Sequence, residues 1–380
     1  MNLTPAQLAQ FDKDGYLFFP GLFTPEETKT LNAAVPELYS RREAFNVREK
    51  GSDAVRTNFA AHMYSEPFAK LGRHPRMIKP VEELFGEKLY MHQFKINGKM
   101  AFEGDVWQWH QDYGTWLNDD MMPTERAMNV AIFLDDVNAY NGPLMFIPGS
   151  HKKGVIEAKH DLTTTSYPLW TVDNALITQL VARAGDKNGG IVSPTGPAGS
   201  MILFHSCLVH ASASNLSPWN RNAVYLSLCA VSNHIRRHKR PEFIAHRDFT
   251  PIECLPDDCL SKSYPVDLPW GKGMPASALE TSLDEIKVAV KEFGGETLDG
   301  IKAFERAEAK KAKEDTLMAK AQAAQAEAAK KAEPAAAAPA ATPAAPAGPV
   351  EVIAEWPAAM PDVYKVRFET TKGDIIIECR

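Results

Sequence analysis

The chain lacks the features that mark membrane-spanning and secreted proteins. None of its hydrophobic runs approaches the roughly 18 to 20 residues that a membrane-spanning helix needs. Its first segment, "MNLTPAQLAQFDKDGYLFFP", has polar and acidic residues where a signal peptide has a basic and then an apolar stretch. The five cysteines are an odd number and are widely spread, which favours a reducing compartment over a disulfide framework. These absences predict a soluble, cytoplasmic protein that does not enter a membrane.

The chain also lacks an excess of positive charge, because its 42 lysines and arginines are outnumbered by 48 aspartates and glutamates. The formal net charge is −6, and the chain has one short basic run, "HIRRHKRPEF", at residues 234–243. A nucleic-acid-binding protein needs a clustered basic surface, so this charge balance argues against such a partner. We therefore predict a small-molecule substrate and no nucleic acid. The oligomeric state stays open at this point, with a homodimer as one alternative.

What the sequence does contain is a short helical opening followed by many short β-like runs. Thr-Pro pairs at residues 4–5 and 24–25 are helix-start signals, and a further helix is predicted over residues 75–85. From residue 88 to residue 231, runs such as "KLYMHQFKI", "AMNVAIFLDDV" and "NAVYLSLCAVS" alternate with turn residues. This pattern predicts a mainly β domain over residues 1–285, built as a sandwich or barrel with helices outside it.

The last quarter of the chain has a different composition. Residues 286–333 are rich in Ala, Lys and Glu and predict a solvated helix, and residues 334–350 form a Pro/Ala linker that cannot bury a core, so together they predict a disordered tether. Residues 351–380 include "YKVRFETTKGDIIIECR", two alternating runs around a turn. This tail resembles the opening hairpin of cyclophilin-type peptidyl-prolyl isomerases, and a coincidental β-hairpin is an equal alternative. We assign it no activity.

The segment "WHQDYGTW" at residues 109–116 contains the first candidate ligands. His110 and Asp112 are one residue apart in a predicted strand, where alternate side chains share a face. The third candidate is His210 in "FHSCLVHASASN", whereas His205 lies five residues earlier and should face the other way. Two histidines and one carboxylate form the facial triad of non-haem Fe(II) oxygenases, with three coordination positions left open. An isolated H-x-D is also a common surface or core pair.

Arg221 provides the second element of such a site. It lies eleven residues after His210, at the start of the next predicted strand. Its planar, permanently charged guanidinium suits a bidentate carboxylate anchor. The combination predicts Fe(II), a keto-acid cosubstrate that takes two metal positions, and dioxygen in the third.

Longer stretches resemble one family. "YMHQFKIN", "WHQDYGTW", "NGPLMFIPGSHK", "PTGPAGS" and "RPEFIAHRD" are similar to segments of the phytanoyl-CoA dioxygenase superfamily of Fe(II)/2-oxoglutarate oxygenases, and within it to the ectoine hydroxylases. The match spans about residues 46–248. It implies a double-stranded β-helix (jelly-roll, cupin-like) core. It also implies hydroxylation of an unactivated C–H bond with release of succinate and CO2, and therefore 2-oxoglutarate and O2 as cosubstrates.

The resemblance also implies roles for individual residues. Gln93, Thr115, Trp116 and Arg240 fall on substrate positions, and Lys95 and Asn129 join Arg221 as candidates for 2-oxoglutarate. An apolar wall, an amide and a guanidinium suit a small zwitterion with a carboxylate, such as ectoine. A core tryptophan and a solvated arginine are the structural alternatives.

Four positions depart from the family pattern and leave the substrate open. This chain has Gly114 where the family pattern has an acid and Leu117 where it has a histidine. It has Ala131 in place of a serine and Lys95 in place of an arginine. The first alternative is therefore the same reaction on a different amino acid or amine. A non-catalytic binding or scaffold protein and a cupin-like hydrolase or isomerase with another metal are the others.

Overall fold

The computed structural model describes residues 1–161, 168–185, 190–271, 364–370 and 373–379. The chain divides into two units, Met1–Lys302 and Ala303–Arg380. The predicted solvated helix at 286–333 and the Pro/Ala linker at 334–350 lie outside the described residues. The domain limits therefore stay predictions.

Three helices of the first unit begin at the predicted signals. They are α1 (Pro5–Asp14), α2 (Pro25–Ser40) and α4 (Pro75–Phe85). The short helix α3 (Glu66–Leu71) was not predicted. In α2 the Thr24 hydroxyl accepts from the Glu27 backbone N–H, and the Glu27 carboxylate accepts from the Thr24 N–H. Such a capping box satisfies two backbone donors that a helix start leaves unpaired. Two short 3-10 turns, η1 (Ala61–Met63) and η2 (Ser150–Lys153), lie in connections.

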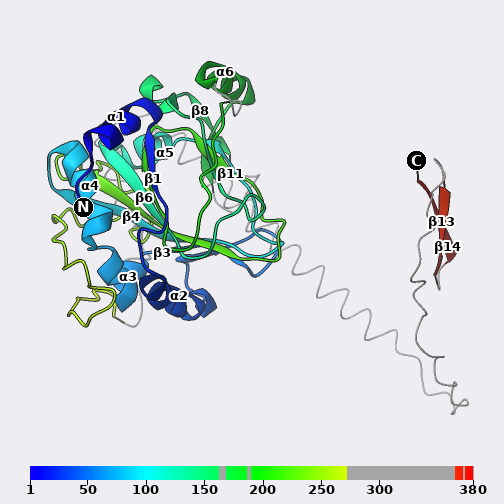
Figure 1. The fold of residues 1–380 in the computed structure, drawn as a ribbon, viewed down its shortest axis with the longest axis horizontal. Helices are drawn as coiled ribbons and strands as arrows, with labels where there is room; N and C mark the ends of the chain where they lie inside the picture. The colour runs from blue at the N-terminus through cyan, green and yellow to red at the C-terminus, as the bar shows by residue number, and fades with distance from the viewer. Residues whose placement is uncertain (162–167, 186–189, 272–363, 371–372, 380) are drawn as a thin grey trace, which may run out of the picture. The chain divides into compact units, whose positions relative to one another are not determined.

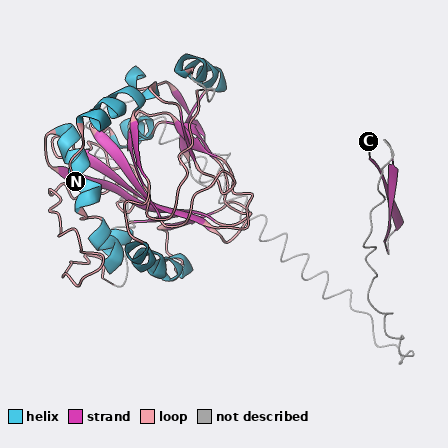
Figure 2. Ribbon diagram, in the orientation of Figure 1, coloured by secondary structure: helices cyan, strands magenta, loops and turns pink. Residues whose placement is uncertain are grey.

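Two antiparallel sheets form the body of this unit (Figure 2). The larger has the order β1 (Tyr16–Phe19), β10 (Met201–His205), β6 (Ala127–Phe133), β12 (Arg221–Ala230), β4 (Leu89–Lys99), β3 (Val55–Phe59) and β2 (Asn46–Arg48). The smaller has the order β7 (Leu144–Phe146), β11 (His210–Ser212), β5 (Trp107–His110), β9 (Leu169–Val172) and β8 (Ala158–Asp161). The predicted mainly β, jelly-roll class with flanking helices is confirmed.

Period-two alternation gives the larger sheet two different faces. On β12, Val224 and Leu226 join the core cluster that includes residues of the helices α2 and α4. Ala223 and Tyr225 point the other way and join a second cluster with Leu144 and Phe146 of the smaller sheet. Figure 1 shows the helices α1 to α4 against the outer side of the larger sheet. The inner face between the sheets is therefore the place where polar side chains can surround a ligand.

One segment differs from the expected pattern. The strand predicted to hold both His110 and Asp112 ends at His110, and the helix α5 (Asp112–Asp120) begins two residues later. In the smaller sheet, β9 is followed by the helix α6 (Asn174–Ala184). Val192 makes only an isolated bridge with Phe146 among the described residues.

The second unit contains one described element pair. The strands β13 (Tyr364–Thr370) and β14 (Gly373–Cys379) pair antiparallel, with Tyr364 opposite Cys379. This is the hairpin pattern that the two alternating runs indicate. The resemblance to the start of a cyclophilin stays a prediction.

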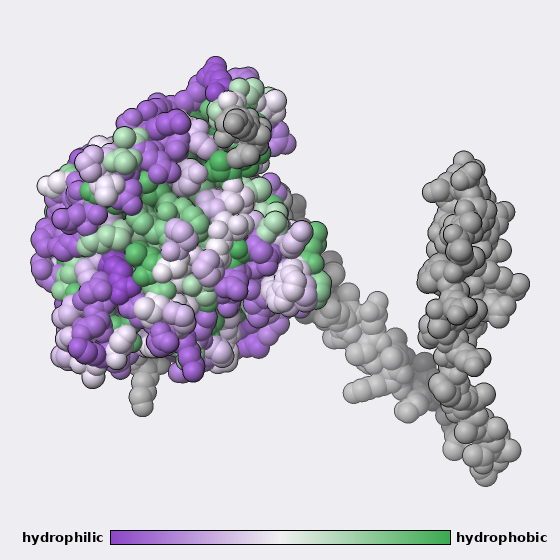
Figure 3. Space-filling model, viewed as in Figure 1, coloured by the Kyte–Doolittle hydropathy of each residue, from purple (hydrophilic) through white to green (hydrophobic). Residues whose placement is uncertain are grey.

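The visible surface of the first unit is mixed in polarity. Figure 3 shows hydrophilic residues over much of its periphery and a group of hydrophobic residues nearer the middle. Within the described ranges, no helix has the length and apolar character needed to cross a bilayer.

We expect acid to destabilise this fold, because two histidines are buried in their neutral form. Burial lowers the pKa of His246 to about 3 and that of His74 to about 4, from 6.5. Their Nε2 atoms have no hydrogen-bond partner in the part of the chain that the structure describes. Such a histidine stays neutral in the folded state, whereas the unfolded chain takes up a proton below about pH 6.5. The free energy of unfolding is therefore unaffected by these histidines above that pH. It decreases as the pH falls towards 4, by about 1.4 kcal/mol per pH unit for each histidine.

Urea unfolding of the metal-free protein at pH 7.5, 6.0 and 5.0 measures this dependence. We expect the free energy of unfolding to drop steadily across the series. A flat profile would contradict the neutral state assigned to these histidines.

Candidate active site

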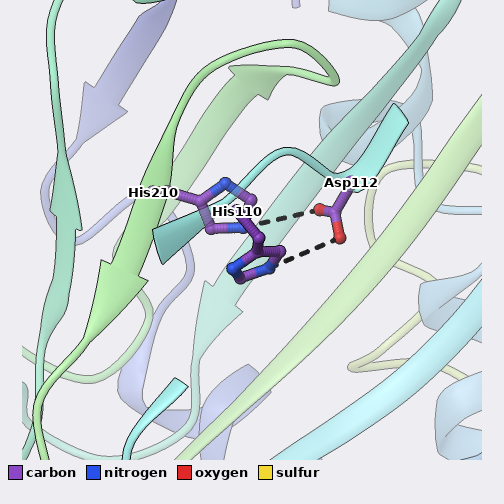
Figure 4. Close-up of side chains that lie close together, drawn as sticks. All are labelled: His110, Asp112 and His210. Atoms are coloured by element: carbon purple, nitrogen blue, oxygen red, sulfur yellow. Dashed lines mark ion pairs between the residues drawn. The ribbon is translucent and has the colours of Figure 1, made fainter. Parts of the chain in front are cut away.

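Three side chains from two strands and one helix converge between the sheets. His110 is the last residue of β5 and His210 the first of β11, and the two are directly opposite each other in the antiparallel pair. Their ring centroids are 4.1 Å apart. Asp112 Oδ1 lies 3.8 Å from His110 Nε2, and Asp112 Oδ2 lies 3.6 Å from His210 Nε2. Figure 4 shows the carboxylate facing both imidazoles.

Asp112 reaches this position by a different route from the one predicted. Strand alternation placed it on the face of His110, but it is the first residue of α5, after the strand has ended. The turn into the helix brings the carboxylate back towards the two rings. His205 is not part of the group: its Nδ1 accepts from the Cys207 N–H at 3.0 Å, and its ring lies beside His151.

Backbone contacts orient both histidines for metal binding. His110 Nδ1 lies 2.6 Å from the Gln108 carbonyl oxygen, and His210 Nδ1 lies 2.9 Å from that of Leu208. A proton on each Nδ1 is donated to the carbonyl, which leaves the Nε2 lone pair towards Asp112. The three ligand atoms lie within 4.8 Å of one another. This donor set fits a divalent metal such as Fe(II), with room for further ligands.

The electrostatics of the site favour the protonation states that metal ligands need. Burial and the neighbouring His210 lower the pKa of His110 to about 3. Burial raises the pKa of Asp112, but Lys95 and the two histidines outweigh it and lower the value to about 2. Neutral imidazoles and an ionised carboxylate are therefore the states at neutral pH, and these are the forms that bind a metal.

Asn129 lies behind the triad rather than in the cavity. Its Nδ2 donates to Asp112 Oδ2 at 2.6 Å, and its Oδ1 accepts from the Ser227 hydroxyl at 2.7 Å. Outer partners of this kind fix the orientation of a ligating carboxylate. The predicted contact of Asn129 with the cosubstrate stays a prediction.

One cavity is lined by the triad and by most of the other predicted residues. Its empty space, open mouth included, is about 690 Å³. The predicted residues that line it are Gln93, Lys95, His110, Asp112, Thr115, Trp116, His210, Arg221 and Arg240. Segments far apart in the sequence thus meet around one space, as a binding site requires.

Buried polar atoms without partners mark where ligand atoms belong. Arg221 donates through Nη2 to the Gly142 carbonyl oxygen, but its buried Nε has no hydrogen-bond partner among the described residues. The buried hydroxyls of Ser212 and Thr115 also lack partners within this part of the chain, and both residues line the cavity. Native proteins rarely leave such groups unpaired, so these atoms favour a polar ligand. Sequence reasoning missed Ser212, although its position two residues after His210 on β11 places it on the same face.

The residues predicted to bind the substrate line the cavity and also form hydrogen bonds within the protein. Trp116 Nε1 donates to Gln93 Oε1 at 3.1 Å, and Gln93 Nε2 donates to the Ile244 carbonyl oxygen at 2.9 Å. Arg240 Nε donates to the buried Asp120 carboxylate at 2.9 Å. Trp116 is therefore a core residue and a wall of the cavity at once, and Arg240 is a paired rather than a solvated arginine.

Comparison with known proteins finds a matching family. The family model for phytanoyl-CoA dioxygenase (PhyH) matches residues 11–223. An ectoine dioxygenase of Bordetella bronchiseptica is 35% identical over 261 residues, which is 64% of this chain and 83% of the relative. An L-proline trans-4-hydroxylase of Streptomyces griseoviridis is 33% identical over 253 residues, covering 64% of this chain and 92% of the relative.

The same likeness holds in three dimensions. The crystal structure of EctD from S. alaskensis with 2-oxoglutarate and 5-hydroxyectoine has a TM-score of 0.59 and 32% identity, over 67% of this chain and 87% of that one. A structure of EctD with bound Fe has a TM-score of 0.58 and the same coverage. The family model spans more than half of this sequence. The matched range includes all three triad residues and Arg221. The chain belongs to the phytanoyl-CoA dioxygenase family.

Proposed function

We propose that this protein hydroxylates an unactivated C–H bond of a small zwitterion that carries a carboxylate, with ectoine and cyclic amino acids such as proline as the first candidates. The enzyme is an Fe(II)/2-oxoglutarate-dependent dioxygenase. The observation that carries the proposal is the His110, Asp112 and His210 group, whose ligand atoms lie within 4.8 Å of one another. A same-class reaction on another amino acid or amine is the alternative.

The residues present fit the iron and its cosubstrate. His110, Asp112 and His210 would hold the iron, which supplies oxygen activation coupled to conversion of 2-oxoglutarate into succinate and CO2. Arg221 is assigned to the distal carboxylate of 2-oxoglutarate, because it lines the cavity and its buried Nε has no hydrogen-bond partner among the described residues. Ser212, whose buried hydroxyl also lacks a partner there, lines the same cavity and is a second candidate donor. The protein otherwise positions the reactants and excludes water.

The charges that line the cavity support a substrate with a carboxylate. Lys95, Arg221 and Arg240 line it, whereas Asp112 is its acidic residue. Buried Asp120 balances part of the charge of Arg240 from behind. A neutral zwitterion with a carboxylate towards Arg240 or Lys95 fits this remaining positive charge better than a cationic amine does. The unpaired Thr115 hydroxyl and the face of Trp116 suit a small ring.

The relatives support the substrate class but do not distinguish between ectoine and proline as the substrate. The ectoine dioxygenase at 35% and the L-proline trans-4-hydroxylase at 33% are almost equally similar to this chain. Both named substrates are small, cyclic and zwitterionic, which is why the proposal names this class. A cytoplasmic location and a homodimer remain part of the proposal.

Coupled turnover tests the proposal. The protein is loaded with Fe(II) and 2-oxoglutarate without oxygen and then exposed to air with ectoine, proline, pipecolate or lysine. We expect one added oxygen in a cyclic substrate for each succinate formed. In Thr115→Val we expect the KM for that substrate to rise about tenfold, the cost of a lost hydrogen bond, with the KM for 2-oxoglutarate unchanged. Succinate formation with no coupled product from any cyclic zwitterion would reject the substrate class.

A further inference from the structure

Asp120 is the last residue of the helix α5 and is completely buried. No role was predicted for it from the sequence. The same helix begins with the metal ligand Asp112, so one short helix joins the triad to this carboxylate. The chain leaves α5 through Met121 with a φ of 51°, a left-handed conformation that is unfavourable for a residue with a side chain. Surrounding contacts must therefore hold this end of the helix in place.

The contacts of Asp120 connect it to Arg240. Arg240 Nε donates to Asp120 Oδ1 at 2.9 Å, and Arg240 Nη2 donates to Asp120 Oδ2. A guanidinium with two hydrogen bonds to one carboxylate is fixed in direction as well as in place. The backbone carbonyl of Asp120 accepts from the N–H groups of Arg236 and Arg237 at 3.0 and 2.9 Å. The backbone thus ties the segment to α5, and the Asp120 side chain orients the guanidinium.

His92 is the second neighbour of this carboxylate, and its Nε2 lies 3.2 Å from Asp120 Oδ2. Consecutive residues of β12 pair with Met91 and Gln93, which leaves His92 as the extra residue of a β-bulge. Gln93 lines the cavity, whereas His92 is buried against Trp116, with ring centroids 5.2 Å apart. Neighbouring residues of β4 therefore serve the cavity wall and the buried carboxylate.

This buried group contains one charge of each sign. Burial raises the pKa of Asp120, but Arg240 and His92 outweigh burial and lower it, so the carboxylate is ionised at neutral pH. Burial lowers the pKa of His92, so its ring is neutral. Because Asp120 offsets the charge of Arg240, the attraction of a ligand carboxylate to Arg240 depends on where the guanidinium is held.

We propose that Asp120 is a positioning residue that holds the Arg240 guanidinium in the geometry that binds the carboxylate of the substrate. The inference rests on the proposed function, in which Arg240 or Lys95 receives that carboxylate, and it selects Arg240. A long arginine side chain loses rotamer freedom when it binds a ligand. The pair with Asp120 orders Arg240 in advance, so the substrate meets a partner that is already in place at the cavity.

Anaerobic titration calorimetry with ectoine and with proline tests this on the protein loaded with Fe(II) and 2-oxoglutarate. We expect Asp120→Asn to weaken binding of the cyclic zwitterion at least about tenfold, as for hydrogen bonds to charged groups. Affinity for 2-oxoglutarate should stay within about twofold of the parent value. Charge balance alone predicts the opposite sign, because the variant makes the pocket more positive. Tighter or unchanged binding of the zwitterion would overturn the positioning role.

Asp119→Asn is the matched control. Asp119 is the preceding residue of α5, is also buried, and pairs with Lys239 at 2.6 Å. The Lys239 side chain is half exposed, and within the described ranges it is not among the residues that line the cavity. This variant should bind the zwitterion and 2-oxoglutarate like the parent protein. An equal loss in both asparagine variants would show a general disturbance of α5 and would overturn the specific role of Asp120.

A double-mutant cycle with Arg240→Met separates positioning from folding. If Asp120 acts through Arg240, the double variant should bind the zwitterion as weakly as Arg240→Met does alone. The double variant leaves no unpaired buried charge, so this comparison still decides if thermal unfolding shows that Asp120→Asn alone is not folded. A further loss in the double variant would overturn the inference. A parent protein that binds 2-oxoglutarate but neither ectoine nor proline would instead overturn the proposed substrate class, and the inference with it.

Discussion

Replacing His210 with alanine should abolish stoichiometric iron binding and lower succinate formation at least about a thousandfold. Among the described residues, His210 supplies one of the two imidazoles that face Asp112. The loss of outer partners alone typically costs about 10- to 100-fold in metal affinity or activity. The remaining His110 and Asp112 cannot complete a three-ligand site. Iron content after anaerobic reconstitution and succinate formation in air are the two measurements.

His205→Ala is the control for this prediction. His205 is the other histidine of the same segment, is partly buried, and lies on β10 beside His151 instead of at the triad. We expect this variant to bind one iron per chain and to form succinate. Thermal unfolding of both metal-free variants checks that each is folded. Full iron binding by His210→Ala, with loss of iron in His205→Ala, would show that the wrong histidine has been assigned.

Replacing Arg221 with alanine should raise the KM for 2-oxoglutarate about a hundredfold or more, while saturating 2-oxoglutarate restores most of kcat. Arg221 is buried and supplies a charged donor whose Nε has no hydrogen-bond partner within the described ranges. Removing one partner of a buried, hydrogen-bonded charge pair typically costs about 2 to 5 kcal/mol, and each 1.36 kcal/mol is a factor of ten. Initial rates of succinate formation over a range of 2-oxoglutarate concentrations measure the effect.

Two comparisons make the Arg221 result specific. Arg221→Lys keeps the charge but loses the planar fork, so its KM should lie between those of the parent and the alanine variant. The KM for the substrate that becomes hydroxylated should stay within about twofold of the parent value in both variants, because Thr115 and Arg240 are assigned to that ligand. A normal KM for 2-oxoglutarate in Arg221→Ala would remove the anchor assignment.

The sequence determined the chemical identity of the site because ligand types and their local spacing are written in it. His110, Asp112, His210 and Arg221 were predicted from residue type and spacing, the ligand atoms of the first three lie within 4.8 Å of one another, and Arg221 begins β12 as predicted. The β-rich class also followed from local signals, since turn residues and period-two runs act over a few residues. These features depend on residue type and near neighbours alone.

Only the tertiary structure decided how those residues meet. The pairing of His110 opposite His210 joins segments about 100 residues apart, and non-local pairing of this kind leaves no local signal. The helix start at Asp112, the orientation of its carboxylate by Asn129, and the partnerless hydroxyls of Ser212 and Thr115 all depend on packing. A hydrogen bond that is made or missing is a property of two groups in space, so a one-dimensional pattern can name the donors but cannot say which of them are left for a ligand.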